Sequence, residues 1–149
     1  NPDDQLFCPT VFEDVAFGLR NLQVSEEDIA RRVRESLRVV GMESAETRGA
    51  FHLSVGQKKR VALAPVLALG SEILVIDEPA SNLDPRGRRE LAALLASIGG
   101  TQIVATHNLE LVRQLCTRVL VLRQGRLVAD RERAALLSDE AFLTAHDLR

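Results

Sequence analysis

The chain has 149 residues, of which 46% are hydrophobic and 27% charged, and its formal net charge is −2. That length and apolar content suffice for one domain with a hydrophobic core, and the lack of a basic excess argues against a nucleic-acid partner. The longest apolar run, residues 61–69, is too short to cross a bilayer. Cys8 and Cys116 lack the spacing of metal ligands, which favours unpaired thiols in a reducing compartment over a disulfide.

Helical patterns dominate the first half of the chain. Apolar residues recur at helical spacing after Thr10, and Ser25 followed by three acidic residues is typical of a helix start. We expect Gly41 to end this second helix. Its predicted apolar stripe consists of Ile29, Val33, Leu37 and Val40.

A third helix is predicted from residues 53–57, Leu-Ser-Val-Gly-Gln. Ser54 can cap it, Gly56 allows a ligand to approach the backbone closely, and the unpaired N–H groups of the first turn form an anion site. Pro65 lies inside the helical pattern, where it removes a hydrogen bond and clashes with the preceding turn. We therefore expect a kink near Pro65 or an early helix end.

Residues 72–79, Glu-Ile-Leu-Val-Ile-Asp-Glu-Pro, are central to the functional prediction. Four consecutive apolar residues indicate a strand that is buried on both faces of a parallel sheet. Carboxylates at the end of such a strand are costly unless cations meet them, and ligands of open α/β sheets bind at this end. The pattern predicts a site for Mg²⁺ and phosphate, with Asp77 as a metal-side ligand and Glu78 as a base toward water. In the alternative interpretation, Asp77 caps a turn and Glu78 is a solvated surface charge.

Helices and strands alternate regularly after this segment. Asp84 followed by proline predicts a helix that reaches about Ser97. Residues 102–105 predict a second strand, which ends just before His107, and Asn108 can cap the short helix that follows.

The last part of the chain continues the alternation. Residues 118–123 predict a third strand, which turns back into residues 127–129, and the final 18 residues predict one or two short helices with Ser138 as a candidate cap. This order indicates a parallel sheet with right-handed crossovers. We expect a helical subdomain over residues 1–70 and the sheet-containing remainder over residues 71–149.

Four motifs, in this order, resemble those of ABC-type ATPase domains. Residues 53–57 resemble the signature motif, residues 73–78 the Walker B strand with its catalytic glutamate, residues 81–84 the D-loop, and His107 the switch histidine. The resemblance covers nearly the whole chain. It implies an α/β fold that is part of a P-loop NTPase (RecA-like) parallel sheet, with a helical signature subdomain.

The resemblance also implies residue roles. Asp77 would hold Mg²⁺, Glu78 would polarise the water that attacks the γ-phosphate of ATP, and His107 would contact that phosphate. Asp84 would link two sites across a dimer. The residues implied to contact the γ-phosphate of an ATP held by the opposite subunit are Ser54, Val55, Gly56 and Gln57. Taken singly, a histidine at position 107 is more often a surface or core residue, and Asp84 is explained as a helix cap.

Residues 1–7 and 13–18 are most similar to the ATPases of energy-coupling-factor importers of the cobalt and nickel type. This narrower resemblance implies an ATP-hydrolysing subunit at the cytoplasmic face of the membrane. Its implied partners are a second ABC ATPase subunit, in a homo- or heterodimer, and a transmembrane transporter subunit that contacts residues 1–50. Other subunits of such importers choose the cargo.

The chain departs from the family pattern in several places. Neither of its two lysines follows a glycine, so the Walker A loop, whose backbone wraps the phosphates, is not found, and the Q-loop glutamine would precede Asn1. We therefore expect the chain to be the C-terminal part of a longer protein. Val55 and Asn82 each replace a glycine of the family; valine resists a left-handed backbone, which asparagine tolerates.

Two further hypotheses remain open. The chain could be a non-catalytic, truncated ABC module that completes a partner subunit's ATP site, which needs no Walker A loop. A phospho-acceptor domain of receiver type would also use Asp77 and Mg²⁺. It would require a lysine after a late strand, however, and Lys58 and Lys59 are the only lysines in the sequence.

We expect the 149-residue chain to bind Mg-ATP only weakly by itself, because it has no glycine-rich loop to wrap the phosphates. Isothermal titration of the chain with Mg-ATP should therefore show no binding in the micromolar range. Micromolar affinity would contradict this account of the missing loop.

Overall fold

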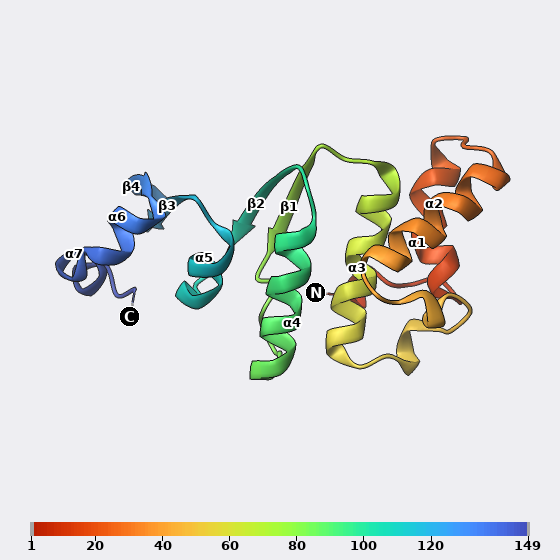
Figure 1. Cartoon of the computed structure of the whole chain (residues 1–149), viewed down its shortest axis with the longest axis horizontal. Coiled ribbons are helices and arrows are strands. Elements are labelled where there is room, and N and C mark those ends of the chain that lie inside the picture. Colours follow the sequence, from red (N-terminus) through yellow and green to blue (C-terminus); the bar gives the residue numbers. More distant parts are fainter. Residues whose placement is uncertain (1, 149) are drawn as a thin grey trace.

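The computed structural model describes residues 2–148. Its elements form three groups along the long axis: α1 to α3, then β1 and β2 with α4 and α5, then the β3–β4 hairpin with α6 and α7 (Figure 1). The helices and strands are α1 (Val11–Asn21), α2 (Glu26–Val39), α3 (Val55–Leu69), β1 (Ile73–Asp77), α4 (Pro85–Ser97), β2 (Thr101–Ala105), α5 (Leu109–Leu115), β3 (Arg118–Arg123), β4 (Arg126–Glu132), α6 (Arg133–Ser138) and α7 (Glu140–Ala145).

The helices of the first group begin where the sequence predicted, and the second one also ends as predicted. Thr10 caps α1 and Ser25 caps α2, each accepting a hydrogen bond from the backbone N–H three residues later. The predicted stripe of α2 is at most 1% exposed, and Gly41 follows the helix with a left-handed φ of 66°. No strand occurs between residues 2 and 69.

Helix α3 is the element on which α1 and α2 both pack, and it continues without interruption past Pro65 to Leu69. An early helix end at Pro65 is therefore wrong. The proline removes one N–H donor from the helix, while burial of Val61 and Ala64 beside it holds the turn in the core. Packing thus outweighs the local preference.

The parallel sheet is confirmed, but its first strand is not buried on both faces. β1 pairs in parallel with β2 over its whole length. Leu74 and Ile76 are 6% and 9% exposed and belong to the main core, whereas Ile73 and Val75 are 56% and 70% exposed. Within residues 2–148, helices therefore cover one face of this sheet, and the other face is open to solvent.

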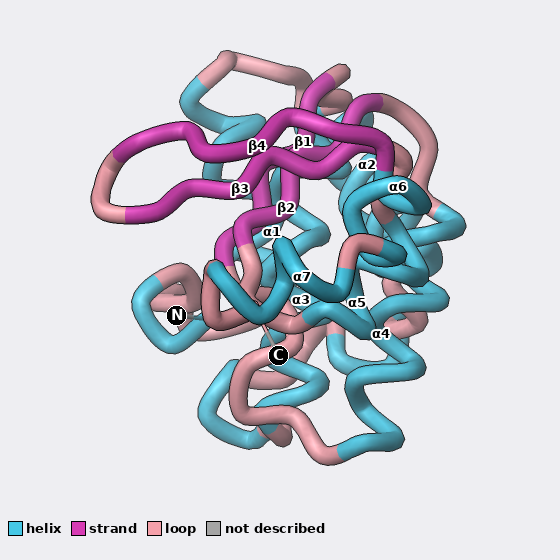
Figure 2. Tube along the Cα trace, turned by 90° about the vertical axis from the view of Figure 1, so that its left-hand side faces the viewer, coloured by secondary structure: helices cyan, strands magenta, loops and turns pink. Residues whose placement is uncertain are grey.

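The predicted third strand does not join the parallel sheet in the described part of the chain. β3 pairs antiparallel with β4 instead, through a turn in which Gln124 and Gly125 both have positive φ (49° and 74°). Two left-handed residues give the tight turn whose twist matches a hairpin. In Figure 2 the hairpin lies in front of β1 and β2 rather than beside them in one sheet.

The two C-terminal helices are as predicted, except for the residue that caps the second one. Ser138 is the last residue of α6, and its hydroxyl donates to the carbonyl of Ala135. Asp139 caps α7 by accepting from the N–H of Phe142 at 2.9 Å. A carboxylate is favoured at this position because its charge complements the helix dipole. None of the helices described between residues 2 and 148 combines the length and the apolar content of a membrane span.

Candidate functional site

The carboxyl ends of the two parallel strands lie level with each other. Asp77 and Ala105, the last residues of β1 and β2, are paired in the register. The N–H of Glu78 donates to the carbonyl of Ala105 at 2.8 Å, which extends the pairing one residue beyond the strand. The loops that follow the strands therefore leave the sheet side by side, as expected for a ligand site of an α/β sheet.

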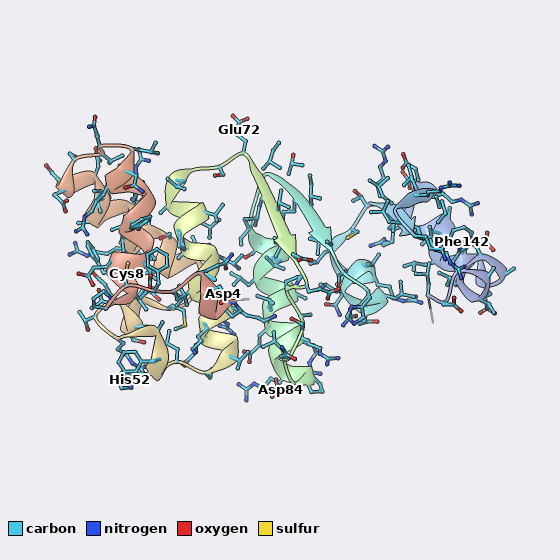
Figure 3. The ribbon with its side chains drawn as sticks, turned by 180° about the vertical axis from the view of Figure 1, so that it is seen from behind. Asp4, Cys8, His52, Glu72, Asp84 and Phe142 are labelled. Atoms are coloured by element: carbon cyan, nitrogen blue, oxygen red, sulfur yellow. The ribbon has the colours of Figure 1, made fainter. Side chains whose placement is uncertain are left out.

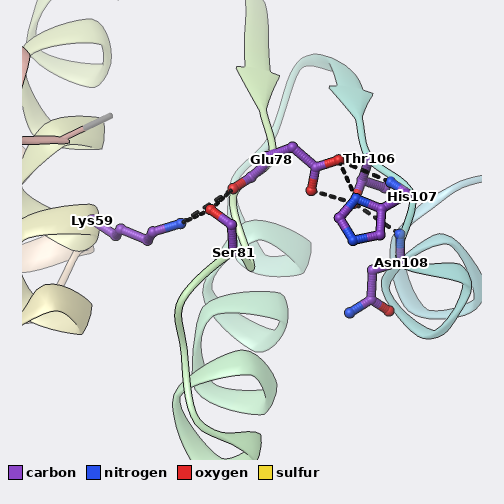
Figure 4. Close-up of polar contacts among 6 residues, drawn as sticks. All are labelled: Lys59, Glu78, Ser81, Thr106, His107 and Asn108. Carbon is purple, nitrogen blue, oxygen red and sulfur yellow. Dashed lines mark hydrogen bonds and ion pairs between the residues drawn. The ribbon is translucent and has the colours of Figure 1, made fainter.

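This register brings Glu78 and His107 into contact, although they are 29 residues apart in sequence. One carboxylate oxygen of Glu78 accepts from the backbone N–H of His107 at 3.0 Å and lies 2.7 Å from its ring Nδ1 (Figure 4). The other oxygen accepts from the hydroxyl of Thr106 at 3.2 Å. The imidazole remains 86% exposed, while the Glu78 side chain is 35% exposed. The carboxylate is thus fixed, and the ring stands open to a ligand.

These contacts determine how Glu78 ionises. Burial acts to raise its pKa, but the hydrogen bonds and charge of His107, with the hydroxyl of Thr106, outweigh it and lower the pKa below its ordinary value. The ionised carboxylate therefore stabilises the fold above about pH 4.3, the pKa expected in an unfolded chain, and this contribution is lost as the pH falls through the folded pKa.

The backbone of Glu78 is as constrained as its side chain. Its φ is 45°, a left-handed conformation that is rare for a residue with a side chain. Its carbonyl accepts from the N–H of Ser81 at 3.2 Å, from the hydroxyl of Ser81 at 2.9 Å, and from Nζ of Lys59 at 3.2 Å. Nothing in the sequence pattern distinguished Lys59 from Lys58, and no role was predicted for Ser81 or Thr106.

Asp77 lies at the end of β1, and its side chain is exposed. No hydrogen bond or ion pair joins it to residues 2–148, and no three His, Cys, Asp or Glu side chains there are grouped as a metal cage. A single free carboxylate suits Mg²⁺, which keeps most of its water and takes its other oxygens from phosphates. The exposed carboxylate of Asp77 therefore fits a magnesium ion that takes its other oxygens from phosphate and water.

The remaining predicted residues lie around a separate open cavity of about 500 Å³, between the starts of α3 and α4. Ser54 and Gln57 form a capping box, with Ser54 Oγ 3.3 Å from the Gln57 N–H and Gln57 Oε1 2.9 Å from the Ser54 N–H. Val55 is 48% exposed. A Cβ on Gly56 would lie 3.7 Å from Leu83, an ordinary contact. Space for a ligand, rather than the fold, would thus require glycine at this position.

The loop between β1 and α4 lines the same cavity. Asn82 has a φ of 58°, which agrees with the prediction that asparagine adopts the left-handed backbone of the glycine it replaces. Asp84 caps α4, accepting from the N–H of Gly87 at 2.6 Å. Figure 3 shows Asp84 and Glu72 at opposite ends of the sheet layer. Asp84 is thus a helix cap, and it lies at the end of the molecule where the strands finish.

Comparisons with known proteins agree with this arrangement. A family model described as "AAA domain, putative AbiEii toxin, Type IV TA system" matches residues 12–113. A putative ABC transporter ATP-binding protein of Gloeobacter violaceus is 48% identical over 99% of the chain, which covers 62% of that protein. The energy-coupling factor transporter ATP-binding protein EcfA of Carboxydothermus hydrogenoformans is 47% identical over 100% of the chain, which covers 56% of that protein.

A solved structure has the same fold. CbiO1 of Clostridium perfringens, described as part of the ABC transporter complex cbiONQ, matches with a TM-score of 0.85 and 36% identity. The match covers 100% of this chain and 61% of that one. The chain thus spans between 56% and 62% of the length of these three relatives.

Removing the imidazole should raise the pKa of Glu78. In His107→Ala, burial remains while the ring hydrogen bond and charge that lower the pKa are lost. Carboxyl ¹³C chemical shifts of Glu78, followed through a pH titration of the chain, measure the change. His52→Ala is the matched control, because that exposed histidine lies in the helical group. An unchanged Glu78 pKa in His107→Ala would show that the ring contact is absent in solution.

Proposed function

Because the chain belongs to the ATP-binding proteins of ABC transporters, we propose that its strand-end carboxylates take part in the hydrolysis of ATP. The observation that carries the proposal is the contact of Glu78 with His107 at 2.7 Å. A carboxylate that is ionised and fixed beside an exposed imidazole is suited to orient a water molecule and accept its proton. The His107 ring, which is 86% exposed despite this contact, is then able to contact the γ-phosphate.

In this proposal Asp77 is the protein ligand of Mg²⁺, held directly or through water. The ion, when bound with ATP, neutralises charge on the phosphates. Glu78 orients the attacking water from the adjacent position in the chain. Thr106 and the backbone of His107 hold the Glu78 carboxylate in place, because both donate to it. In this proposal the protein residues position and polarise the water, and the bond that breaks lies in the nucleotide.

The start of α3 is proposed to contact an ATP molecule held by a second ATPase subunit. Its first turn carries no acidic residue, so the unpaired N–H groups present a positive potential to an anion. Ser54 and Gln57 are fixed by their capping box, while Val55 and Gly56 border open space. Asp84, on the opposite side of the cavity, is proposed to connect the two sites across such a dimer.

The proposed assembly is an importer. Two relatives are named for energy-coupling factor transport and for the cbiONQ transporter complex, so we propose a cobalt, nickel or related micronutrient importer at the cytoplasmic face of the membrane. A transmembrane subunit would contact residues 1–50 of the helical subdomain, which spans residues 1–70, and residues 71–149 would contribute to the ATPase core. The toxin named by the family model is not proposed, because these relatives are named for transport.

A second candidate function is a non-catalytic module that completes a partner subunit's ATP site. It rests on the residues at the start of α3 that border the open cavity, among them Ser54, Gly56 and Gln57. Both candidates use the start of α3 in the same way. They differ in whether Glu78 turns over ATP.

Glu78→Gln should abolish most hydrolysis and keep ATP binding, because the amide retains the shape of the side chain but cannot accept a proton. We expect kcat of the complete natural polypeptide to fall by about a hundredfold or more, within the range for loss of a general base. The control is Glu72→Gln, an exposed glutamate at the opposite end of the sheet layer. Unchanged steady-state hydrolysis in Glu78→Gln would remove Glu78 from its proposed role.

Gly56→Ala tests the start of α3. The fold has room for the added Cβ, so the midpoint of urea unfolding should change little, whereas hydrolysis should fall because the methyl group enters the space proposed for a phosphate. Gly99→Ala is the control, since a Cβ there meets nothing within 4 Å. Loss of stability together with activity would instead indicate that glycine is needed for folding.

A further inference from the structure

We propose that Lys59 is a positioning residue for Glu78 and thereby couples the start of α3 to the strand-end site. Its ammonium group holds the backbone turn from which the Glu78 carboxylate reaches His107. This inference rests on the proposed function, because it concerns the carboxylate that we propose to orient water. No family motif considered in the sequence included position 59.

The Lys59 ammonium group has three N–H donors, and the loop after β1 supplies three acceptors. Nζ lies 3.2 Å from the carbonyl oxygen of Glu78 and 2.9 Å from the hydroxyl of Ser81 (Figure 4). It also lies 2.7 Å from the carbonyl oxygen of Pro79. Each of the three donors of the ammonium group can thus find an acceptor in one short loop. The Ser81 hydroxyl in turn donates a hydrogen bond to the Glu78 carbonyl at 2.9 Å, which closes the network.

This network lies at a left-handed residue, since the φ of Glu78 is 45°. Such a backbone is unfavourable for a residue with a side chain and persists only where its surroundings hold it. Glu78 is held on three sides: its N–H by Ala105 of β2, its carboxylate by Thr106 and His107, and its carbonyl by Lys59 and Ser81. Of these groups, Lys59 is the one that comes from the helical group.

The position of Lys59 on α3 places the contact close to the helix start that is proposed to bind ATP. It lies five residues after Ser54, little more than one turn from the helix start that is proposed to meet the ATP of a second subunit. The next residue, Arg60, pairs instead with Glu90 of α4. Two adjacent residues of α3 thus make polar contacts with the β1–α4 unit, and of these two only Lys59 acts on the peptide group of Glu78. A shift of the helix start is transmitted to that carbonyl through one side chain.

The test is Lys59→Met, which keeps the length and apolar stem of the side chain and removes its donors. In the complete natural polypeptide we expect kcat for Mg-ATP to fall about tenfold with KM changed by less than about twofold, since a displaced carboxylate impairs the reaction more than binding. Lys58→Met is the matched control: the same change about 100° away around the helix, with an expected effect on kcat below about twofold.

Two readouts separate positioning from a general structural role. In the Glu78→Gln background, Lys59→Met should change the residual rate by less than about twofold, because a residue that acts through Glu78 has nothing left to position. In addition, the backbone amide ¹H–¹⁵N signals of Glu78 and His107 should shift in Lys59→Met and stay in place in Lys58→Met, because both N–H groups belong to the contacts that the held turn makes. Equal kcat losses in both backgrounds, or unmoved signals in Lys59→Met, would overturn the proposal.

The outcome also distinguishes the two levels of inference. If Glu78→Gln leaves hydrolysis unchanged, the proposed function fails, and the amide signals of Glu78 and His107 in Lys59→Met still decide whether the contact positions the turn. If Lys59→Met does not fold, Ser81→Ala replaces it, since this change removes one acceptor of Lys59 and one donor to the Glu78 carbonyl. The amide signals of Glu78 and His107 should shift in this variant as well, and unmoved signals would again overturn the proposal.

Discussion

The parallel register of β1 with β2 is the constraint on which the candidate site depends. It places residue 78 directly beside the loop that begins at residue 106, so that a carboxylate from one strand meets an imidazole from the next. A slip by one residue would turn Glu78 to the other face of the sheet, because side chains alternate along a strand. The burial of Leu74 and Ile76 beneath α4 prevents that slip, since these residues have to face the core. Hydrophobic packing thus fixes the geometry of a polar site.

Local order along the chain was largely predictable, because it depends on residues close in sequence. The caps Ser25, Ser54 and Asp84 form as predicted, since a side-chain oxygen at a helix start has one favourable partner, the N–H three residues on. The apolar run before Asp77 and Glu78 predicted that these two residues lie at the end of a strand. The prediction that His107 belongs with them came from family resemblance, and the structure supplies the contact.

The errors about the sheet, and the failure to single out Lys59, have a common physical cause: the residue pattern of one segment does not determine which segment it contacts. The run of apolar residues in β1 does not reveal whether a second layer of the protein covers Val75. The residue pattern of β3 does not reveal which strand it pairs with. The turn at Gly125 decided that choice locally, in favour of β4. Lys59 was missed because its partners are backbone carbonyls, which every sequence offers and no motif marks.

The open face of the parallel sheet has a thermodynamic consequence. Ile73, Val75 and Ile103 are each more than half exposed and lie on neighbouring strands. Together they form one apolar surface that is covered by water. Any protein layer that covers this surface releases that water, and the association will carry a negative change in heat capacity, the most dependable calorimetric mark of apolar burial. The enthalpy of such an association would therefore become more favourable as the temperature rises.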